Sequence, residues 1–264
     1  EIACPKDFFN MPIWDKGFVW PNMNKNWQVE FVRLMKNIRS SDTRLSCITI
    51  LAAGIMASIL QQHGMKCKNY INFVMLDTTI IKKLIQFFAV FNRQAPTVIM
   101  ADETKKCISA MLSKCNDEVV IVDALVGKSS YEKQKIDKNL YLLHKKIIDV
   151  GNTYQINRDV NATMIVINRQ VSVLRGAINI FVDRDFGFSG EQTVEPVTWF
   201  ITALVNYIQG NFDYIESVID RMKDEAYTVL QIVWRVIQMF FESQDVDIAQ
   251  ELQITSENPF EFLD

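Results

Sequence analysis

The stretch YINFVMLDTTIIKKLIQFFAVFN, from Tyr70 to Asn92, decides the fold. It begins with an apolar run, Tyr70 to Leu76, which predicts a buried strand. A polar patch, Asp77-Thr78-Thr79, follows. The remainder has large apolar residues at helical spacing and predicts a helix over Lys82–Asn92 with an apolar face made of Leu84, Phe87, Phe88 and Phe91. The stretch therefore predicts a strand, a short loop and a helix in succession.

Strand, short loop and helix form the frame of a phosphate-binding P-loop. A working P-loop uses glycines so that backbone N–H groups wrap the phosphates, a lysine that reaches the β- and γ-phosphates, and a Ser or Thr for magnesium. Lys82 stands where that lysine is expected, but Lys83 replaces the Ser or Thr, and Leu76 and Thr79 replace glycines. The candidate nucleotide-binding residues are Asp77, Thr78, Thr79, Lys82 and Lys83.

The missing glycines argue against tight nucleotide binding. The β-branched residues Thr79 and Ile80 poorly tolerate the positive φ that a phosphate cradle can require. Asp77 puts a negative charge near the phosphate oxygens, although Asp or Thr also caps a helix N-terminus well. Three interpretations stay open: a loop that binds ATP, an inherited but degenerate loop, and a coincidental strand–helix junction. We expect no cofactor, with Mg-ATP as the alternative.

Two later strands end in polar residues that suit nucleotide chemistry. Val119–Asp123 has the Walker B form, in which a terminal carboxylate holds Mg²⁺, although Ala124 stands where an ATPase usually has a second acid. Thr163–Ile167 is followed by Asn168, in the place of a γ-phosphate sensor. Asp123 and Asn168 are therefore the candidate catalytic residues, and Asp123 is the candidate Mg²⁺ ligand. Candidate phosphate contacts, or alternatively ordinary surface arginines, are Arg169, Arg175 and Arg184.

The order of the elements predicts an α/β fold with a mostly parallel sheet sandwiched by helices. Residues 66–190, where continuous apolar strands alternate with helices, form the predicted core. Residues 1–65 are expected to add an aromatic lead-in and helices packed on that core. Residues 191–264 are expected to form a C-terminal helical region with a loose acidic tail from Gln244 onward.

Composition narrows the class of protein. The chain has 264 residues, 49% of them hydrophobic, and a net charge of −3, which fits one large domain or a domain with an appendage. Five cysteines without a Cys-x-x-Cys pair, and only two histidines, argue against a zinc site and for reduced thiols. The longest apolar run, Cys47 to Leu60, is shorter than the roughly 20 residues that span a bilayer. We therefore expect a cytoplasmic protein without membrane contact.

The element order resembles the ATPase core of helicase-like proteins from bacterial mobile elements and prophages, of the P-loop (RecA/AAA+-like) class. The residues that resemble it most are Asp117–Leu125, Ser130-Tyr131 and Asn139–Leu143, and the resemblance covers roughly Asn69 to Asp185. In intact members the loop and the Walker B acids bind Mg-ATP. Of the residues that do so, this chain matches Lys82, Asp123 and Asn168. The resemblance implies a setting in mobile-element DNA replication or transfer, with DNA as a partner by analogy.

Three functions stay open from the sequence. The first is a degenerate P-loop NTPase-like domain, a pseudoenzyme with an assembly or regulatory role, whose partners are other domains of a larger chain or further copies of itself. The second is an active or nucleotide-sensing ATPase/helicase with an atypical loop. The third is a non-enzymatic α/β interaction module that acts through the aromatic residues Phe8, Phe9, Trp14 and Trp20.

Overall fold

The computed structural model describes residues 24–76, 79–88, 98–112, 115–125, 129–148, 160–187, 195–254 and 260. Within these residues five strands form one sheet: β1 (Tyr70–Val74), β2 (Val98–Met100), β3 (Asn116–Asp123), β4 (Asn161–Asn168) and β5 (Ala177–Phe181). Their order across the sheet is β2-β3-β4-β1-β5, and every described pair is parallel. The predicted α/β fold class is confirmed, and the sheet is consistent with a P-loop-like fold.

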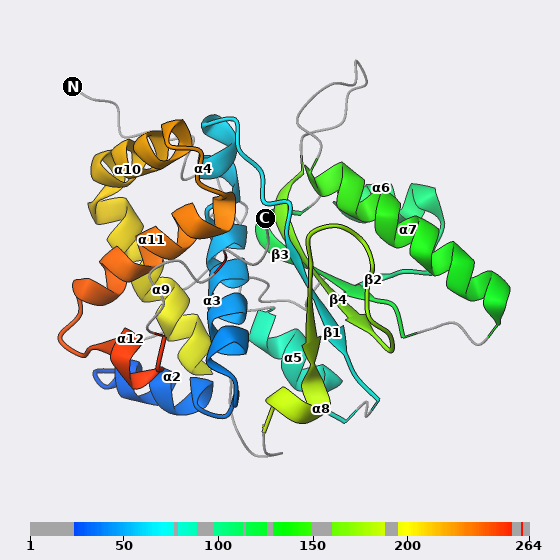
Figure 1. Ribbon diagram of the computed structural model, residues 1–264, viewed down its shortest axis with the longest axis horizontal. Coiled ribbons are helices and arrows are strands. Elements are labelled where there is room, and N and C mark those ends of the chain that lie inside the picture. Colours follow the sequence, from blue (N-terminus) through cyan, green and yellow to red (C-terminus); the bar gives the residue numbers. More distant parts are fainter. Residues whose placement is uncertain are drawn as a thin grey trace.

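Helices cover both faces of the sheet (Figure 1). One face carries α3 (Ser41–Ile55), α4 (Ala57–Gln62) and α5 (Ile81–Phe88), and the other carries α6 (Lys105–Leu112) and α7 (Ser130–Ile148). Successive side chains of a strand point to opposite faces. In β1, Ile71 and Phe73 accordingly enter the core on the α3 side, whereas Tyr70 enters the core on the α7 side.

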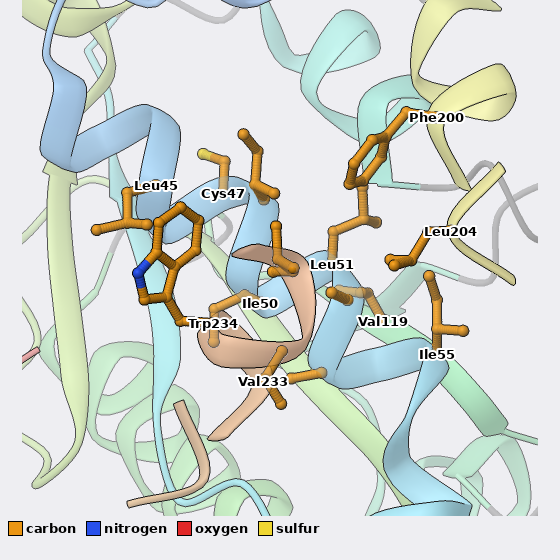
Figure 2. Close-up of a cluster of buried hydrophobic side chains, with 14 of the residues drawn as sticks. Leu45, Cys47, Ile50, Leu51, Ile55, Val119, Phe200, Leu204, Val233 and Trp234 are labelled. Carbon is orange, nitrogen blue, oxygen red and sulfur yellow. The ribbon is translucent and has the colours of Figure 1, made fainter. Parts of the chain in front are cut away.

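A second layer of helices lies outside α3. It contains α2 (Trp27–Met35), α9 (Glu195–Gly210), α10 (Phe212–Asp224), α11 (Val229–Glu242) and α12 (Ile248–Glu251). Helix α3 contacts both the sheet and α11, so apolar side chains are buried all around it. Figure 2 shows Ile50 and Leu51 of α3 among Val119 of β3 and Trp234 of α11. The early and late helices thus share one core with the sheet, and domain boundaries at 66 and 190 stay a prediction.

The helical segment from Ser41 to Gln62 is interrupted at Met56, which lies between the end of α3 and the start of α4. The reason lies outside the helix. The Asp117 carboxylate accepts hydrogen bonds from the Ser58 N–H (2.7 Å) and hydroxyl (2.6 Å), so it caps a new helix N-terminus. Gly64 follows α4 with a φ of 71°, the left-handed conformation in which glycine commonly ends a helix.

The described part of the C-terminal tail, residues 244–254 and 260, is packed, which corrects the expectation of a loose tail. It forms α12 and buries Ile248, Leu252 and Phe260. The buried Arg44 guanidinium holds it in place by donating to the carbonyl of Leu252 (2.6 Å) and to those of Ile38 and Arg39. Burial lowers the pKa of Arg44. Carbonyl dipoles satisfy this buried cation.

The aromatic lead-in with Phe8, Phe9, Trp14 and Trp20 lies outside the described residues, and so do Asp77 and Thr78. Among the helices that are described, none combines the length and the apolar character needed to cross a membrane.

Candidate functional site at the carboxyl edge of the sheet

The carboxyl ends of parallel strands meet at one edge of the sheet. Asp123 is the last residue of β3, and Asn168 is the last residue of the neighbouring β4. Asp123 lies opposite Ile167, and Asn168 lies opposite Val74 of β1. The structure therefore places Asn168 next to the point where the chain leaves β1 for the predicted loop, and places Asp123 one strand further along the same edge.

Both side chains bond to nearby backbone. Asp123 is half-buried, and its Oδ1 accepts a hydrogen bond from the Leu125 N–H (2.9 Å). Asn168 is buried, and its Oδ1 accepts from the Arg169 N–H (2.8 Å). Asp and Asn side chains commonly end strands and begin turns in this way. These contacts alone give each residue a structural role.

A carboxylate occupies the end of β1. The Leu76 N–H donates to Oδ2 of Asp183 (3.2 Å), and the preceding Met75 N–H donates to the carbonyl of Asn168 (2.9 Å). Asp183 belongs to α8 (Val182–Asp185), which follows β5 directly. A P-loop offers backbone N–H groups in this region to phosphate oxygens. Here a side-chain carboxylate accepts from the first of them.

Sequence reasoning did not single out Asp183. A signal for it exists, because Asp183 directly follows the largely apolar run Ile178–Val182, just as Asn168 follows the run Thr163–Ile167. Its contact with Leu76 could not be read from the sequence, because it depends on β5 pairing with β1.

The remaining loop candidates lie at the start of α5. Thr79 and Ile80 form a turn, and the Ile80 carbonyl accepts from the N–H groups of Lys83 (3.0 Å) and Leu84 (3.1 Å). Lys82 is exposed on the first helical turn, and Lys83 is half-buried beside it. The two lysines lie on consecutive residues of the helix, about 100° apart around its axis, so they point in different directions.

The candidate arginines lie at different edges of the sheet. Arg169 follows β4 at the carboxyl edge and is exposed. Arg175 lies at the amino edge, because the next residue, Gly176, accepts a hydrogen bond from the N–H of Tyr70, where β1 begins (3.0 Å). A strand of this length separates the two edges by about 15 Å. The structure therefore does not bring Arg175 to Asp123.

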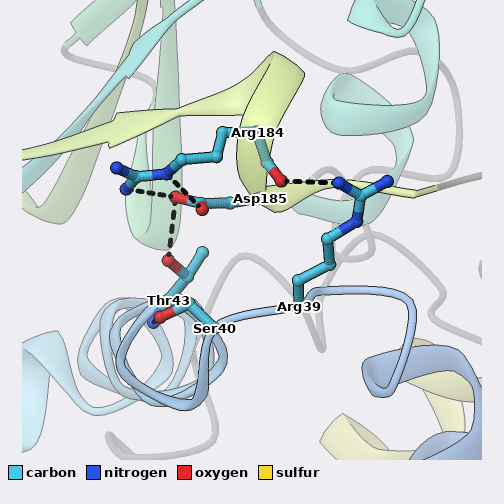
Figure 3. A network of polar contacts seen from close by, with 5 residues as sticks. All are labelled: Arg39, Ser40, Thr43, Arg184 and Asp185. Carbon is cyan, nitrogen blue, oxygen red and sulfur yellow. Dashed lines mark hydrogen bonds and ion pairs between the residues drawn. The ribbon is translucent and has the colours of Figure 1, made fainter.

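Arg184 belongs to a network that joins α8 to the helices on one face of the sheet (Figure 3). Its guanidinium donates to both carboxylate oxygens of the buried Asp185 (2.9 and 3.2 Å), which also accepts from the Thr43 hydroxyl (3.4 Å). Arg39 completes the network by donating to the Arg184 carbonyl (3.3 Å). These contacts attach α8 to the start of α3 and so help to place Asp183 beside Leu76.

Asp123 is the candidate Mg²⁺ ligand at this edge of the sheet. No group of three or more His, Cys, Asp or Glu side chains in the described part of the chain is arranged to hold a metal ion. One oxygen of the Asp123 carboxylate already accepts from backbone.

Burial raises the pKa of the Cys67 thiol to about 12 and also raises that of Cys47, so these buried thiols stay protonated and unreactive.

One solved structure shares this fold. It is described as "SCCmec type IV Cch - active helicase", with a TM-score of 0.54 and 13% sequence identity. The similarity covers 89% of this chain and 50% of that one, so this chain spans about half the length of the helicase. No protein-family model matches the chain, and no curated protein matches it in sequence. At this identity the similarity shows a helicase-type fold and not an activity.

Proposed function

We propose that this chain is a degenerate P-loop NTPase-like domain of a helicase-type protein, with a role in assembly or regulation instead of ATP turnover. The contact between Asp183 and the Leu76 N–H carries the proposal. A carboxylate there repels nucleotide phosphates and already accepts from a backbone donor that a phosphate would use. The similarity to a solved helicase supports the helicase-type part of this proposal. The setting we propose for it is mobile-element DNA replication in the cytoplasm.

A Mg-ATP titration tests the proposal. A ligand that binds only the folded state raises the melting temperature, by about 2.7 kcal/mol of stabilisation at a hundred times its dissociation constant. We expect neither a thermal shift nor calorimetric heat. A saturable shift that Lys82→Ala removes would instead show a working nucleotide site.

The variant Asp183→Asn tests whether the charge of Asp183 alone excludes nucleotide or whether the loop has also lost the groups that bind phosphate. The amide keeps the shape of the side chain but removes the negative charge at the end of β1. If the carboxylate alone excludes nucleotide, the variant should gain a thermal shift with Mg-ATP. If the loop chemistry is also lost, as Lys83 and Leu76 indicate, the variant should remain unresponsive. Asp137→Asn, on the exposed face of α7, is the matched control.

The second candidate is a nucleotide-sensing ATPase with an atypical loop. The observation in its favour is that Asp123 and Asn168 end neighbouring strands at the edge of the sheet where β1 also ends. The same titration decides between the two functions, because only the second predicts a shift that depends on Lys82.

A further inference from the structure

Two helices near opposite ends of the long axis each expose one polar face. Figure 1 shows α7 toward one end and α10 toward the other. Each helix buries an apolar stripe: Ile136, Leu140, Leu143 and Ile147 in α7, and Ile215, Val218, Ile219 and Met222 in α10. The faces opposite these stripes point away from both cores, and within the described part of the chain their side chains are exposed.

The exposed face of α7 is basic. At about 100° per residue, five exposed side chains fall within an arc of about 80° opposite the buried stripe. This basic stripe consists of Tyr131, Gln134, Lys138, Tyr141 and Lys145. Both acids of the helix, Glu132 and Asp137, fall outside the arc. The two tyrosines are 76% and 53% exposed, so the stripe offers aromatic surface as well as positive charge.

The exposed face of α10 has the opposite sign. Four exposed side chains fall within an arc of about 60° opposite its buried stripe. This acidic stripe consists of Asp213, Ser217, Asp220 and Asp224, with Tyr214 at its flank, 59% exposed. Arg221 and Lys223, the basic residues of the helix, fall outside the arc. Oδ1 of Asp220 lies 2.7 Å from Nδ1 of His63, yet the side chain stays 62% exposed.

The two stripes match in spacing. Lys138 and Lys145 are two helical turns apart, as are Asp213 and Asp220, which places the members of each pair about 10 Å apart along the axis. Among the described residues, Lys138, Lys145, Asp213 and Asp224 take part in no ion pair. Two such helices laid side by side therefore bring lysines to aspartates over more than one turn.

We propose that the basic stripe of α7 binds the acidic stripe of α10 on a second copy of this chain. The contact is head to tail, so each added copy leaves one stripe of each sign unused, and the assembly grows into a chain or closes into a ring. Complementary charge selects the partner surface and speeds encounter, while the tyrosines bury apolar area. The inference rests on the assembly role proposed above and names the partner.

Sedimentation velocity of the intact chain tests the contact. We expect self-association that strengthens with protein concentration from about 2 to 200 µM at ~50 mM salt and weakens at ~500 mM, because salt screens exposed charges. The stripe variants Lys138→Glu with Lys145→Glu, and separately Asp213→Lys with Asp224→Lys, should each raise the dissociation constant by at least about tenfold. The control, Lys106→Glu with Lys133→Glu, makes the same charge change outside the stripe and should associate like the wild type.

Mixing the two stripe variants is the sharpest test. The α7 variant keeps an intact acidic stripe and the α10 variant keeps an intact basic one, so the mixture should regain association that neither variant shows alone. A wild-type chain that stays monomeric, or a mixture that stays monomeric, overturns the proposal. So does an α10 variant that associates normally, which would point to another anionic partner for α7. A monomeric chain that also ignores Mg-ATP overturns only this inference, whereas ATP binding overturns the proposed function.

Discussion

At the scale of single residues, Asp117 is a buried carboxyl group at the amino edge of the sheet. It sits at an irregularity in the β3–β4 pairing and has a φ of 53°, a left-handed value that Asp tolerates better than most residues. Burial raises the pKa of Asp117 to about 6, although the two hydrogen bonds from Ser58 act in the opposite direction. Asp117 therefore caps α4 from a buried position, where its charged form is destabilised because it is shielded from water.

The raised pKa fixes the sign of a pH effect. Between its ordinary pKa of about 4 and the folded value of about 6, the folded protein holds a proton that the unfolded chain has lost. Folding then takes up a proton, so stability falls as pH rises through this range, by up to about 3 kcal/mol for this group. Above that range both the folded and the unfolded chain have lost this proton, so Asp117 causes no further change in stability with pH.

Asp117→Asn should remove this pH dependence. Asn tolerates the same φ, still accepts a hydrogen bond from Ser58 and does not ionise. The free energy of unfolding of the wild type, minus that of the variant, should fall by up to about 3 kcal/mol between pH 4 and pH 7. Urea unfolding across that range measures it, with Asp137→Asn as an exposed control. Parallel curves for the wild type and Asp117→Asn would contradict the assignment.

At the scale of elements, the connection from β4 to β5 crosses the sheet without a helix. Residues 169–176 lie over β1 and β5 and are held by polar side chains of the sheet itself. The buried Asn72 donates to the Gln170 carbonyl (3.0 Å) and to the side chain of Asn179 (2.8 Å). The Tyr70 hydroxyl bonds to that of Ser172 (2.6 Å). Hydrogen bonds thus replace the apolar contacts that a covering helix would make.

Gly176 ends this connection in a place that excludes a side chain. Its φ is 85°, and a Cβ would lie 2.4 Å from the Lys68 carbonyl oxygen, which is backbone. Gly64 has a similar φ of 71° but nothing within 4 Å of such a Cβ. The two positions therefore separate the cost of the backbone angle from the cost of the clash.

Gly64→Ala should lower the free energy of unfolding by about 1 kcal/mol, the cost of positive φ alone. Gly176→Ala should lower it by about 3 kcal/mol or more, because the backbone of two segments must also shift. Urea denaturation measures both values. Equal costs would show that the chain relaxes around residue 176 without penalty.

Local pattern predicted the elements well but not their long-range contacts. The apolar runs around Val119–Asp123 and Thr163–Ile167 predicted β3 and β4, and the apolar face with Leu84 predicted α5. Periodicity could not predict the strand order, the capping of α4 by Asp117, or the hydrogen bond from Leu76 to Asp183. Each depends on partners far apart in the chain, so a prediction from local sequence has no access to them.

At the scale of the whole molecule, α3 links the sheet to the outer helices. Its apolar residues are not gathered on one face, because one side meets β1, β3 and β4 and another meets α11. Leu51 is 1% exposed in the core that includes Val119 of the sheet and Trp234 of α11. Neither layer can keep its apolar surface buried if α3 leaves, so we expect the two to unfold together.

Leu51→Ala tests this coupling. Truncating a fully buried leucine should cost about 3 kcal/mol through lost burial and the cavity left behind. If α3 joins the layers into one cooperative unit, hydrogen exchange should show the opening free energy of β4 and α11 falling by equal amounts. Val29→Ala, on a side chain of α2 that is 56% exposed, should change neither. A loss of protection confined to the helices or to the sheet would show two independent units, and would make residues 66–190 a domain in the energetic sense.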